Sequence, residues 1–369
     1  MKAFPVLAAT LSVVTALLAG CSAVPSSTAP GSTAPGSTSS VTQSGGASGT
    51  RTTGAHPSAI RVFGRIFDNP GATVTGGRLY VTWRVNAATA AVPQFELTRV
   101  DQATGAIEAT RLLTAGQAGT PLSAGGWLWV PVATQAGESL LRLNPASLAE
   151  AGNLAVPGSH LGLGRGSHLA AAGDALWVAT GARLLRVSLI TGQVLASIPL
   201  PGAYTSDVAA NKAGTVLVVS EANDGGIGSV QRRDPVTGAL LASHPILGVS
   251  APSLGGIADS GVWVSEPTGM LGYVERFRVA TMVPVPATDV RGDNGIDGVV
   301  ADSVIWITDR AAPDRDYCAD PVNGRVLARI PLPDPLRDAL LAVSDRYLYY
   351  QSPASSGFYL DRVAVPAAC

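Results

Sequence analysis

A repeated unit of about 40 to 50 residues constrains the fold of this chain more than any other feature. Its clearest copy runs from Asp174 to Pro201, where the apolar runs Ala175–Val178, Leu184–Leu189 and Val194–Pro199 are separated by turn residues. The first two runs are rich in branched and aromatic side chains, which suit a half-buried pleated strand. Gly192 follows the second run and provides the positive φ that a tight hairpin needs. The unit therefore predicts a small antiparallel meander.

Weaker copies of this unit follow one another through most of the chain. One apolar or aromatic position marks them, and it falls at Tyr80, Trp129, Trp177, Leu217, Trp263, Trp306 and Leu348. Turn sequences recur behind it at 101–105, 234–238 and 320–324. An all-β period of this length, with no helical pattern inside it, is typical of propeller blades with four strands each. Seven copies predict an all-β, seven-bladed β-propeller of four-stranded antiparallel blades over residues 59–369.

The last copy is incomplete and predicts how the ring closes. After Leu348 a single further strand is expected at Phe358–Val365. Before the first copy, Ile60–Ile66 resembles closing strands such as Arg325–Ile330. We therefore expect Ile60–Ile66 to complete the seventh blade, because closure removes a sheet edge that would otherwise invite aggregation.

The N-terminus has the pattern of an export signal. Met1-Lys2 precedes an apolar run from Val6 to Leu18, which is short for a membrane span and typical of a signal-peptide core. The tetrad Leu18-Ala19-Gly20-Cys21 resembles the bacterial lipobox, and this resemblance implies cleavage before Cys21 and acylation of its thiol, for example with palmitate. The alternative is an ordinary secretory signal with a chance cysteine. We expect residues 1–20 to be a lipoprotein signal peptide and the lipid to hold the protein on the extracytoplasmic face of a bacterial cell membrane.

Residues 21–58 connect the lipidated Cys21 to the repeats. The tract from 22 to 58 is rich in Ser, Thr, Pro and Gly and has too few apolar side chains to offset the entropy of ordering, which predicts a disordered tether. The whole chain has a net charge of −1, and charged residues make up 14% of it. There is thus no electrostatic case for binding nucleic acid or for adhesion to anionic lipid.

Two of the three cysteines remain once Cys21 is assigned to the lipid. In an exported protein an even remainder predicts a disulfide, here between Cys318 and Cys369. We place Cys318 in the third strand of the sixth blade and Cys369 at the end of the third strand of the seventh. Their Cα atoms should then lie within roughly 7 Å.

The sequence also indicates where a ligand would bind. In a four-stranded meander the second-to-third loop and the connector to the next blade emerge on the same face, and the connectors run close to the axis of the ring. Polar residues from several blades therefore converge on one mouth, where propellers bind ligands. The alternative is that these residues only satisfy backbone turns. The candidate ligand-binding residues are His168, Asp207, Glu221, Glu266, Asp293, Asp309 and Arg337.

The repeats resemble known bacterial propellers. Gly261-Val262-Trp263-Val264-Ser265-Glu266 looks like the blade repeat of streptogramin B lyases. Ala175–Val178 and the Asp-Pro-x-Thr-Gly turns are similar to a wider group of repeat propellers that includes quinoprotein-like ones. The lyase resemblance implies histidine and glutamate at the mouth with a magnesium ion. It carries over to Glu266 by motif, to Glu221 loosely, and to His168 as the one histidine expected near the mouth.

Two classes of function follow. The leading hypothesis is a lipoprotein propeller that acts as a non-enzymatic binding or scaffolding module in the cell envelope. Its mouth would bind a protein, a glycan or a small molecule; no cofactor, metal or catalytic residue is assigned to it. The alternative is a mouth-centred lyase or hydrolase that uses Glu266 or Glu221 with His168, with or without a divalent metal. A carboxylate with a raised pKa beside His168 would favour the enzyme.

Overall fold

The fold was examined in a computed structural model of the chain. It describes residues 71–369 except for 86–92, 114–115, 157–167, 182, 201–203, 216, 223–226, 248–252, 259–260, 267–272, 286–295, 302–303, 310–315, 331–339 and 355–356. These described residues form 28 strands and no helix. Within them there is accordingly no helix long and apolar enough to cross a membrane.

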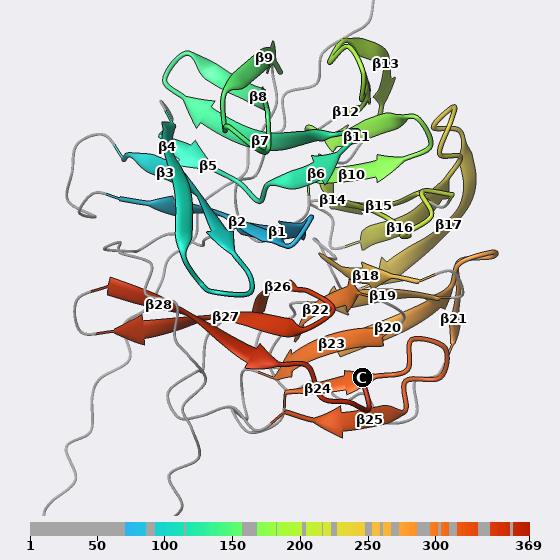
Figure 1. Cartoon of the computed structure of the whole chain (residues 1–369). Helices are drawn as coiled ribbons and strands as arrows, with labels where there is room; N and C mark the ends of the chain where they lie inside the picture. The colour runs from blue at the N-terminus through green and yellow to red at the C-terminus, as the bar shows by residue number, and fades with distance from the viewer. Residues whose placement is uncertain are drawn as a thin grey trace, which may run out of the picture. The chain divides into compact units, whose positions relative to one another are not determined.

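The strands form seven antiparallel sheets, which we number as blades 1 to 7 (Figure 1). Blade 1 contains β1 (Gly71–Thr75), β2 (Arg78–Arg84), β3 (Phe95–Asp101) and β4 (Ile107–Leu113). Blade 2 contains β5 (Gln117–Ala118), β6 (Leu122–Ala124), β7 (Trp127–Thr134), β8 (Gly137–Leu143) and β9 (Glu150–Ala155). Blade 3 contains β10 (Leu169–Ala172), β11 (Ala175–Ala179), β12 (Arg183–Ser188) and β13 (Val194–Pro199).

The remaining blades follow the same order. Blade 4 contains β14 (Tyr204–Ala210), β15 (Leu217–Ala222), β16 (Ile227–Arg233) and β17 (Leu240–Leu247). Blade 5 contains β18 (Ser253–Ile257), β19 (Gly261–Glu266), β20 (Tyr273–Arg278) and β21 (Val283–Val285). Blade 6 contains β22 (Ile296–Ala301), β23 (Val304–Asp309), β24 (Tyr317–Ala319) and β25 (Val326–Arg329). Blade 7 contains β26 (Leu340–Val343), β27 (Tyr347–Ala354) and β28 (Gly357–Ala364).

The predicted seven-bladed, all-β propeller is therefore confirmed. Each blade is a meander in chain order, and in blade 2 the first strand is split into β5 and β6, which both pair with β7. Pro121 lies between these two short strands and lacks the N–H that a continuous ladder would need. The strands predicted for the Asp174–Pro201 unit differ from β11, β12 and β13 by no more than one residue at either end.

The apolar marker of each unit packs against the next blade. Trp177 shares a buried cluster with Leu217 and Val219 of blade 4, whereas its neighbours Leu176 and Val178 face blade 2. Adjacent strand residues point to opposite faces of the sheet. Only every second residue of the second strand can therefore contact the next blade, and the residues between them face the preceding blade. The list of markers with this orientation is Tyr80, Trp129, Trp177, Val218, Trp263, Trp306 and Tyr349.

Two of the predicted markers were therefore wrong by one residue. Leu217 and Leu348 face the preceding blade, and Val218 and Tyr349 occupy the equivalent positions. In both strands several apolar residues are consecutive. The sequence therefore offers no polar neighbour that would tell which residues face the next blade and which face the preceding one.

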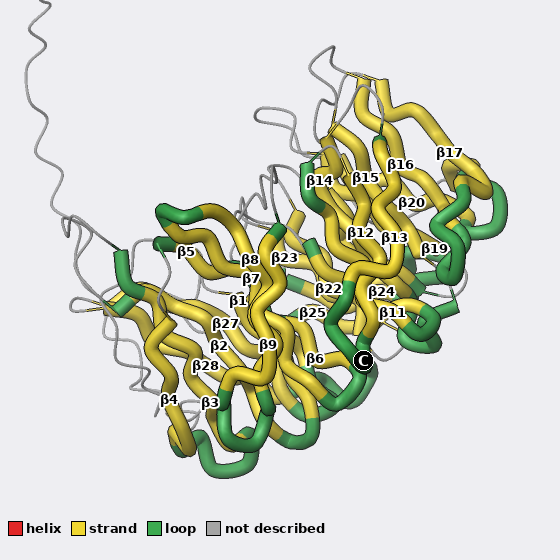
Figure 2. The backbone as a smooth tube through the Cα atoms, turned by 90° about the horizontal axis from the view of Figure 1, so that it is seen from above, coloured by secondary structure: helices red, strands yellow, loops and turns green. Residues whose placement is uncertain are grey.

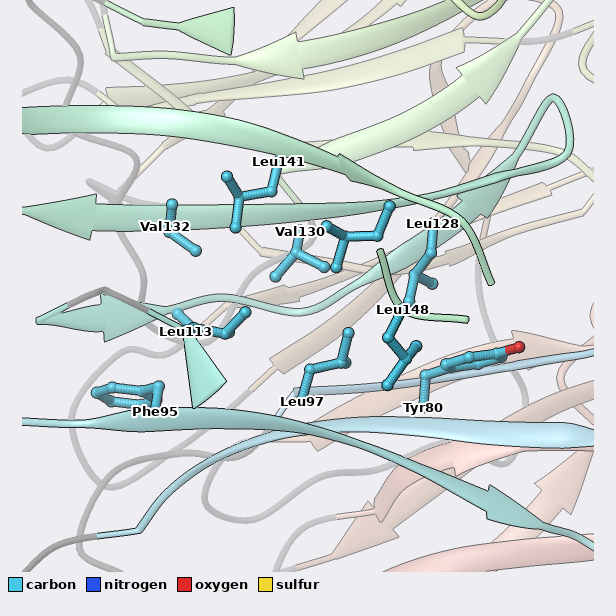
Figure 3. Packing of buried hydrophobic residues seen from close by; sticks show 11 residues of the cluster. Tyr80, Phe95, Leu97, Leu113, Leu128, Val130, Val132, Leu141 and Leu148 are labelled. Atoms are coloured by element: carbon cyan, nitrogen blue, oxygen red, sulfur yellow. The ribbon is translucent and has the colours of Figure 1, made fainter. Parts of the chain in front are cut away.

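The core lies between the sheets rather than inside any one of them. Figure 3 shows the seam between blades 1 and 2, where Tyr80 and Leu97 from blade 1 meet Leu128, Val130 and Leu148 from blade 2. All of these side chains are at most 3% exposed. Full burial of one such side chain stabilises the fold by about 1.5 to 3 kcal/mol. Because each seam joins two blades, a single blade has no complete core.

The turns between third and fourth strands have one geometry. In the turn after β16, the N–H of Gly238 donates to the carbonyl of Asp234 at 2.8 Å, and Gly238 has a φ of 74°. The Asp234 carboxylate accepts hydrogen bonds from the N–H and hydroxyl of Thr237, and these bonds lower its pKa. Gly105 and Gly324 close the predicted turns after β3 and β24 in the same way.

Arginines and aromatic residues join blades 1 to 5 and blade 7 to a turn of the next blade. Trp177 Nε1 donates to the Pro235 carbonyl at 3.2 Å, and Trp263 Nε1 donates to the Pro321 carbonyl at 3.3 Å. From third strands, Arg142 donates to the Ile190 carbonyl at 2.8 Å. We call these contacts the forward clasps. They also include Tyr80 and Arg99 to Pro145, Arg232 to Ala280, and Arg362 to Gln102 and Ala103.

The ring closes between blades 7 and 1. The first strand of every blade contacts the first strands of both neighbours, and β26 contacts β1. Figure 2 shows the described residues as strands and connecting loops, without a helix. Tyr349 packs with Leu79 and Val81 of blade 1, and Arg362 bonds the blade 1 turn. Blade 7 has three described strands. The predicted closing strand, Ile60–Ile66, lies outside the described residues, as do the signal peptide and the tether.

The predicted disulfide between Cys318 and Cys369 is present, with a Cα–Cα distance of 6.1 Å. Cys318 lies in β24, the third strand of blade 6, as expected, and is fully buried. Cys369 lies five residues beyond β28 rather than at its end, because a turn closed by the Cys369 N–H and the Pro366 carbonyl follows the strand. The bridge thus joins blade 6 to the chain segment that follows blade 7.

Candidate functional site

The predicted mouth is the end of the ring at which second strands finish. In an antiparallel meander this is also the end at which first strands begin. Glu221, Glu266 and Asp309 lie at or next to the last residues of β15, β19 and β23, so three successive blades place a carboxylate-bearing residue at this end. The side chains of these three residues are not among those described. Asp293 and Arg337, like Cys21, lie outside the described residues.

Asp207 of the predicted set has a clear structural role. It lies in β14, next to a shift of register between β14 and β15. Its side chain is part of a residue only 1% exposed. Oδ1 accepts the N–H of Val208 at 2.9 Å, and Oδ2 accepts the N–H of Leu254 in β18 at 3.0 Å. Both carboxylate oxygens are thus engaged by backbone, and Asp207 joins the first strands of blades 4 and 5.

Two further described polar residues at the mouth, His168 and Arg84, are also buried. His168 precedes β10, is 9% exposed, and its carbonyl accepts the N–H of Ala179 at 2.9 Å. Arg84 ends β2 and is 6% exposed. His168, Asp207 and Arg84 belong to blades 3, 4 and 1, so the mouth receives polar groups from separate blades. Across the described part of the chain, no group of three or more His, Cys, Asp and Glu residues is placed to hold a metal ion.

A cleft of about 470 Å³ lies at the opposite end of the ring, at the seam between blades 7 and 1. We call it the seam cleft. It is bordered by the first turn of blade 1, the last turn of blade 1 and the first turn of blade 7. Its lining comprises Val74, Gly76, Gly77, Gln102, Ala103, Val343, Ser344, Asp345, Arg346 and Tyr347.

The walls of the seam cleft are fixed by local bonds. Ser344 Oγ accepts the N–H of Tyr347 at 2.9 Å and so closes the blade 7 turn. The Arg362 guanidinium lies over the Tyr347 ring, 4.6 Å from its centroid, while it donates to the blade 1 turn. Asp345 and Arg346 project outward as a loose ion pair of 3.9 Å, and both side chains are 75% exposed. The cleft therefore offers an aromatic wall and one charge of each sign.

Burial sets the ionisation of two tyrosines in blade 7. It raises the pKa of Tyr349, at the seam with blade 1, to about 12. Burial and the nearby Asp316 carboxylate raise the pKa of Tyr350, which faces blade 6. Both hydroxyl groups stay protonated at neutral pH, so they act as dipoles in the seams rather than as bases.

Sequence reasoning missed the seam cleft because its two sides are far apart in the chain. Gly76 and Gly77 come from the first unit, and Ser344 to Tyr347 come from the last. They meet only because the ring closes. The available signal was a pair of turns, one before Arg78 and one before Tyr347. They occupy equivalent places in the first and last units, and these two units become neighbours when the ring closes.

This geometry defines the class of protein as a closed seven-bladed propeller. No protein-family model matches the sequence, and no curated protein matches it either. Among solved structures, the chain is similar to BamB from Moraxella catarrhalis, with 17% identity over 80% of this chain and 85% of that one and a TM-score of 0.51. It is also similar to a chain in the mitotic checkpoint complex, with 13% identity over 95% of this chain and 99% of that one and a TM-score of 0.61. At these identities the likeness shows the fold alone.

Proposed function

We propose that this protein is a lipid-anchored propeller of the bacterial cell envelope that acts as a non-enzymatic binding or scaffolding module. The observation that carries the proposal is the assignment of its three cysteines. Cys318 and Cys369 are joined in a disulfide, a bond typical of oxidising compartments outside the cytoplasm. The remaining cysteine is Cys21, which stands in the lipobox-like tetrad Leu18–Cys21.

The fold supports the binding role. A buried cluster joins every pair of neighbouring blades, including blade 7 and blade 1, so the seven blades form one closed ring with its loops at the surface. One of the structural neighbours comes from a multi-protein complex, and another is the bacterial protein BamB. A propeller on the proposed tether would suit recruitment of a partner at the membrane surface.

The anchor is tested with Cys21→Ser. We expect the wild-type protein to incorporate radiolabelled palmitate and to sediment with membranes, and the variant to lose the label and move to the soluble fraction. Cys369→Ser is the matched control, because it removes a cysteine, one half of the disulfide, without touching the lipobox and should keep both properties. A Cys21→Ser protein that still sediments after a high-salt wash would show that something other than lipid holds it.

The binding role of the mouth is tested by photo-crosslinking in intact cells. A photoreactive residue replaces Glu221 or Glu266 at the mouth and, as the control, Glu108 on the outer strand β4. Crosslinks to one defined envelope component from both mouth positions, with none from Glu108, are the expected result. Equal crosslinking from all three positions would contradict a specific mouth, and turnover of a substrate lost in Glu266→Gln would support the lyase or hydrolase instead.

A further inference from the structure

The seam cleft contains a buried polar side chain whose hydrogen-bonding groups the protein does not use. Gln102 lines the cleft and is only 8% exposed. Its N–H donates to the Gly77 carbonyl at 3.2 Å, and its carbonyl accepts a hydrogen bond from Arg362. Its side-chain amide makes no hydrogen bond with any residue that the structure describes. A primary amide has two N–H donors and an acceptor oxygen, so Gln102 can both donate to a ligand and accept from it.

The aromatic wall of the cleft is held in place from outside the cleft. Tyr347 lines the cleft and is partly exposed. The Arg362 guanidinium lies over its ring at 4.6 Å, and the Tyr349 ring lies 6.3 Å away at an interplanar angle of 60°. Arg362 also bonds the Gln102 carbonyl. One arginine therefore fixes both the aromatic ring and the segment that carries the amide, so a ligand would meet two groups that are already ordered.

The first turn of blade 1 contributes only main chain to the cleft. Gly76 and Gly77 have positive φ values of 55° and 72°. A Cβ added at either position would meet no atom within 4 Å, so it would extend into open space. The volume of about 470 Å³ lies in the range of clefts that bind small ligands, about 300 to 1,000 Å³. The cleft is therefore large enough for a small ligand.

The charges of the cleft balance each other. Among the described residues that line it, only Asp345 and Arg346 are charged; their side chains are 3.9 Å apart and 75% exposed. Exposed charges of opposite sign are screened by solvent and offset each other, so they attract a strongly anionic or cationic ligand little. The Gln102 amide and the Tyr347 ring are uncharged. The lining therefore favours a neutral ligand that has both polar and apolar surface.

We propose that the seam cleft binds a neutral saccharide. Sugar hydroxyl groups donate and accept hydrogen bonds, so neighbouring hydroxyls can satisfy the Gln102 amide. The face of an aromatic ring carries partial negative charge, and the C–H groups on one face of a pyranose ring can pack against the exposed part of Tyr347. The cleft lies at the other end of the ring from the mouth, so this site is independent of the function proposed for the mouth.

The proposal is tested on the purified full chain with Cys21→Ser. Saturation-transfer difference NMR and calorimetry measure the binding of maltotriose, cellotriose, mannotriose and triacetylchitotriose. We expect at least one of them to bind, and Gln102→Leu to weaken its binding by roughly tenfold or more, because an apolar group replaces the hydrogen-bonding amide. Gln193→Leu is the matched control: Gln193 is exposed in the turn before β13, and its replacement should leave the affinity unchanged.

Two further substitutions separate the contribution of the ring from that of the charges. Tyr347→Ala should weaken binding of the same sugar by roughly tenfold or more, whereas Tyr347→Phe keeps the ring and should lose less. Asp345→Asn/Arg346→Gln should change the affinity by less than about threefold, because the ligand is neutral. Loss of binding in this charge variant, with Gln102→Leu unaffected, would overturn the proposal.

Hydrogen exchange of the protein without any substitution in the cleft locates the site even if a cleft variant fails to fold. Addition of the sugar should increase protection in the turns at 76–77, 102–103 and 344–347. Protection that increases only at the mouth would overturn the proposal. It would also be overturned if none of the four sugars binds, or if Gln102→Leu, shown to be folded by far-UV circular dichroism, binds as well as the unsubstituted cleft.

Discussion

A buried carboxylate in a first strand holds two blades together at Asp207. Its two oxygens accept one N–H from its own strand and one from β18. Polar atoms without water around them need such partners, since a buried donor left alone costs about 1 to 3 kcal/mol. Asp207 is therefore a structural residue of the seam between blades 4 and 5.

Replacement of Asp207 by alanine should destabilise the whole ring. We expect Asp207→Ala to lower the free energy of unfolding by roughly 2 to 4 kcal/mol, because both backbone N–H groups lose their acceptor. Asp207→Asn should lose less, because the amide oxygen can still accept one of the two bonds. Urea unfolding followed by tryptophan fluorescence measures the difference. Equal midpoints for Asp207→Ala and the wild type would show that these bonds do not hold the seam.

The marker residues show how far sequence reasoning reaches at this scale. Trp177, Trp263 and Trp306 were placed correctly because tryptophan is rare and large and stands out against its neighbours. Val218 and Tyr349 were missed by one position, because Leu217-Val218-Val219 and Leu348-Tyr349-Tyr350 have no polar residue to mark a face. The role of Asp207 could not be predicted either, since its second partner, Leu254, lies 47 residues away.

At the scale of the element, blade 7 has a strand edge whose expected partner lies elsewhere in the chain. β28 pairs with β27 on one side, and Ile60–Ile66 is the segment predicted to pair with the other. An antiparallel partner would run from the turn end of blade 7 towards the mouth. Gly71, the first residue of β1, would then follow it after a connector of four residues, 67–70.

Proline scanning of the closing strand gives a sharp test. Successive residues of a strand direct their N–H groups alternately towards the partner and away from it. We expect one of Val62→Pro and Phe63→Pro to reduce hydrogen-exchange protection in β28 strongly and the other to reduce it little. Thr52→Pro, in the predicted tether, is the control and should leave β28 protected. Full protection of β28 after deletion of residues 59–66 would rule the closing strand out.

At the scale of the whole molecule, the seam between blades 6 and 7 is held by a covalent bond as well as by packing. The Cys318–Cys369 bridge spans 51 residues and joins blade 6 to the segment beyond β28. Loop-closure entropy predicts roughly 4 kcal/mol of stabilisation for a loop of this size, through the unfolded chain. The seam also has apolar packing of its own between Trp306, Leu348 and Tyr350.

Loss of the bridge should therefore weaken the ring without dismantling it. We expect Cys369→Ser, or reduction of the wild type, to lower the thermal midpoint clearly while far-UV circular dichroism at low temperature stays the same. Cys21→Ser serves as the control for removing a cysteine and should leave the midpoint unchanged. Identical melting of the oxidised and reduced wild type would mean that the loop is already constrained in the unfolded state.

The architecture was predictable from the sequence for a physical reason. Strand alternation, turn glycines such as Gly105, Gly238 and Gly324, and a constant period are local properties, and they fix the blades one at a time. The seam cleft depends on contact between the first and last units, so no local pattern contains it.

The forward clasps have a consequence for how such a chain can change over evolutionary time. Their acceptors are main-chain carbonyls, for example those of Pro145, Ile190, Pro235 and Pro321. A point mutation replaces a side chain but leaves the peptide group in place. A blade with a forward clasp is therefore bonded to a main-chain group of its neighbour, and this acceptor stays in place when a side chain of the turn is replaced. The acceptor of each clasp depends on the conformation of the turn rather than on the identity of its side chains, which is compatible with the divergence of the units in sequence.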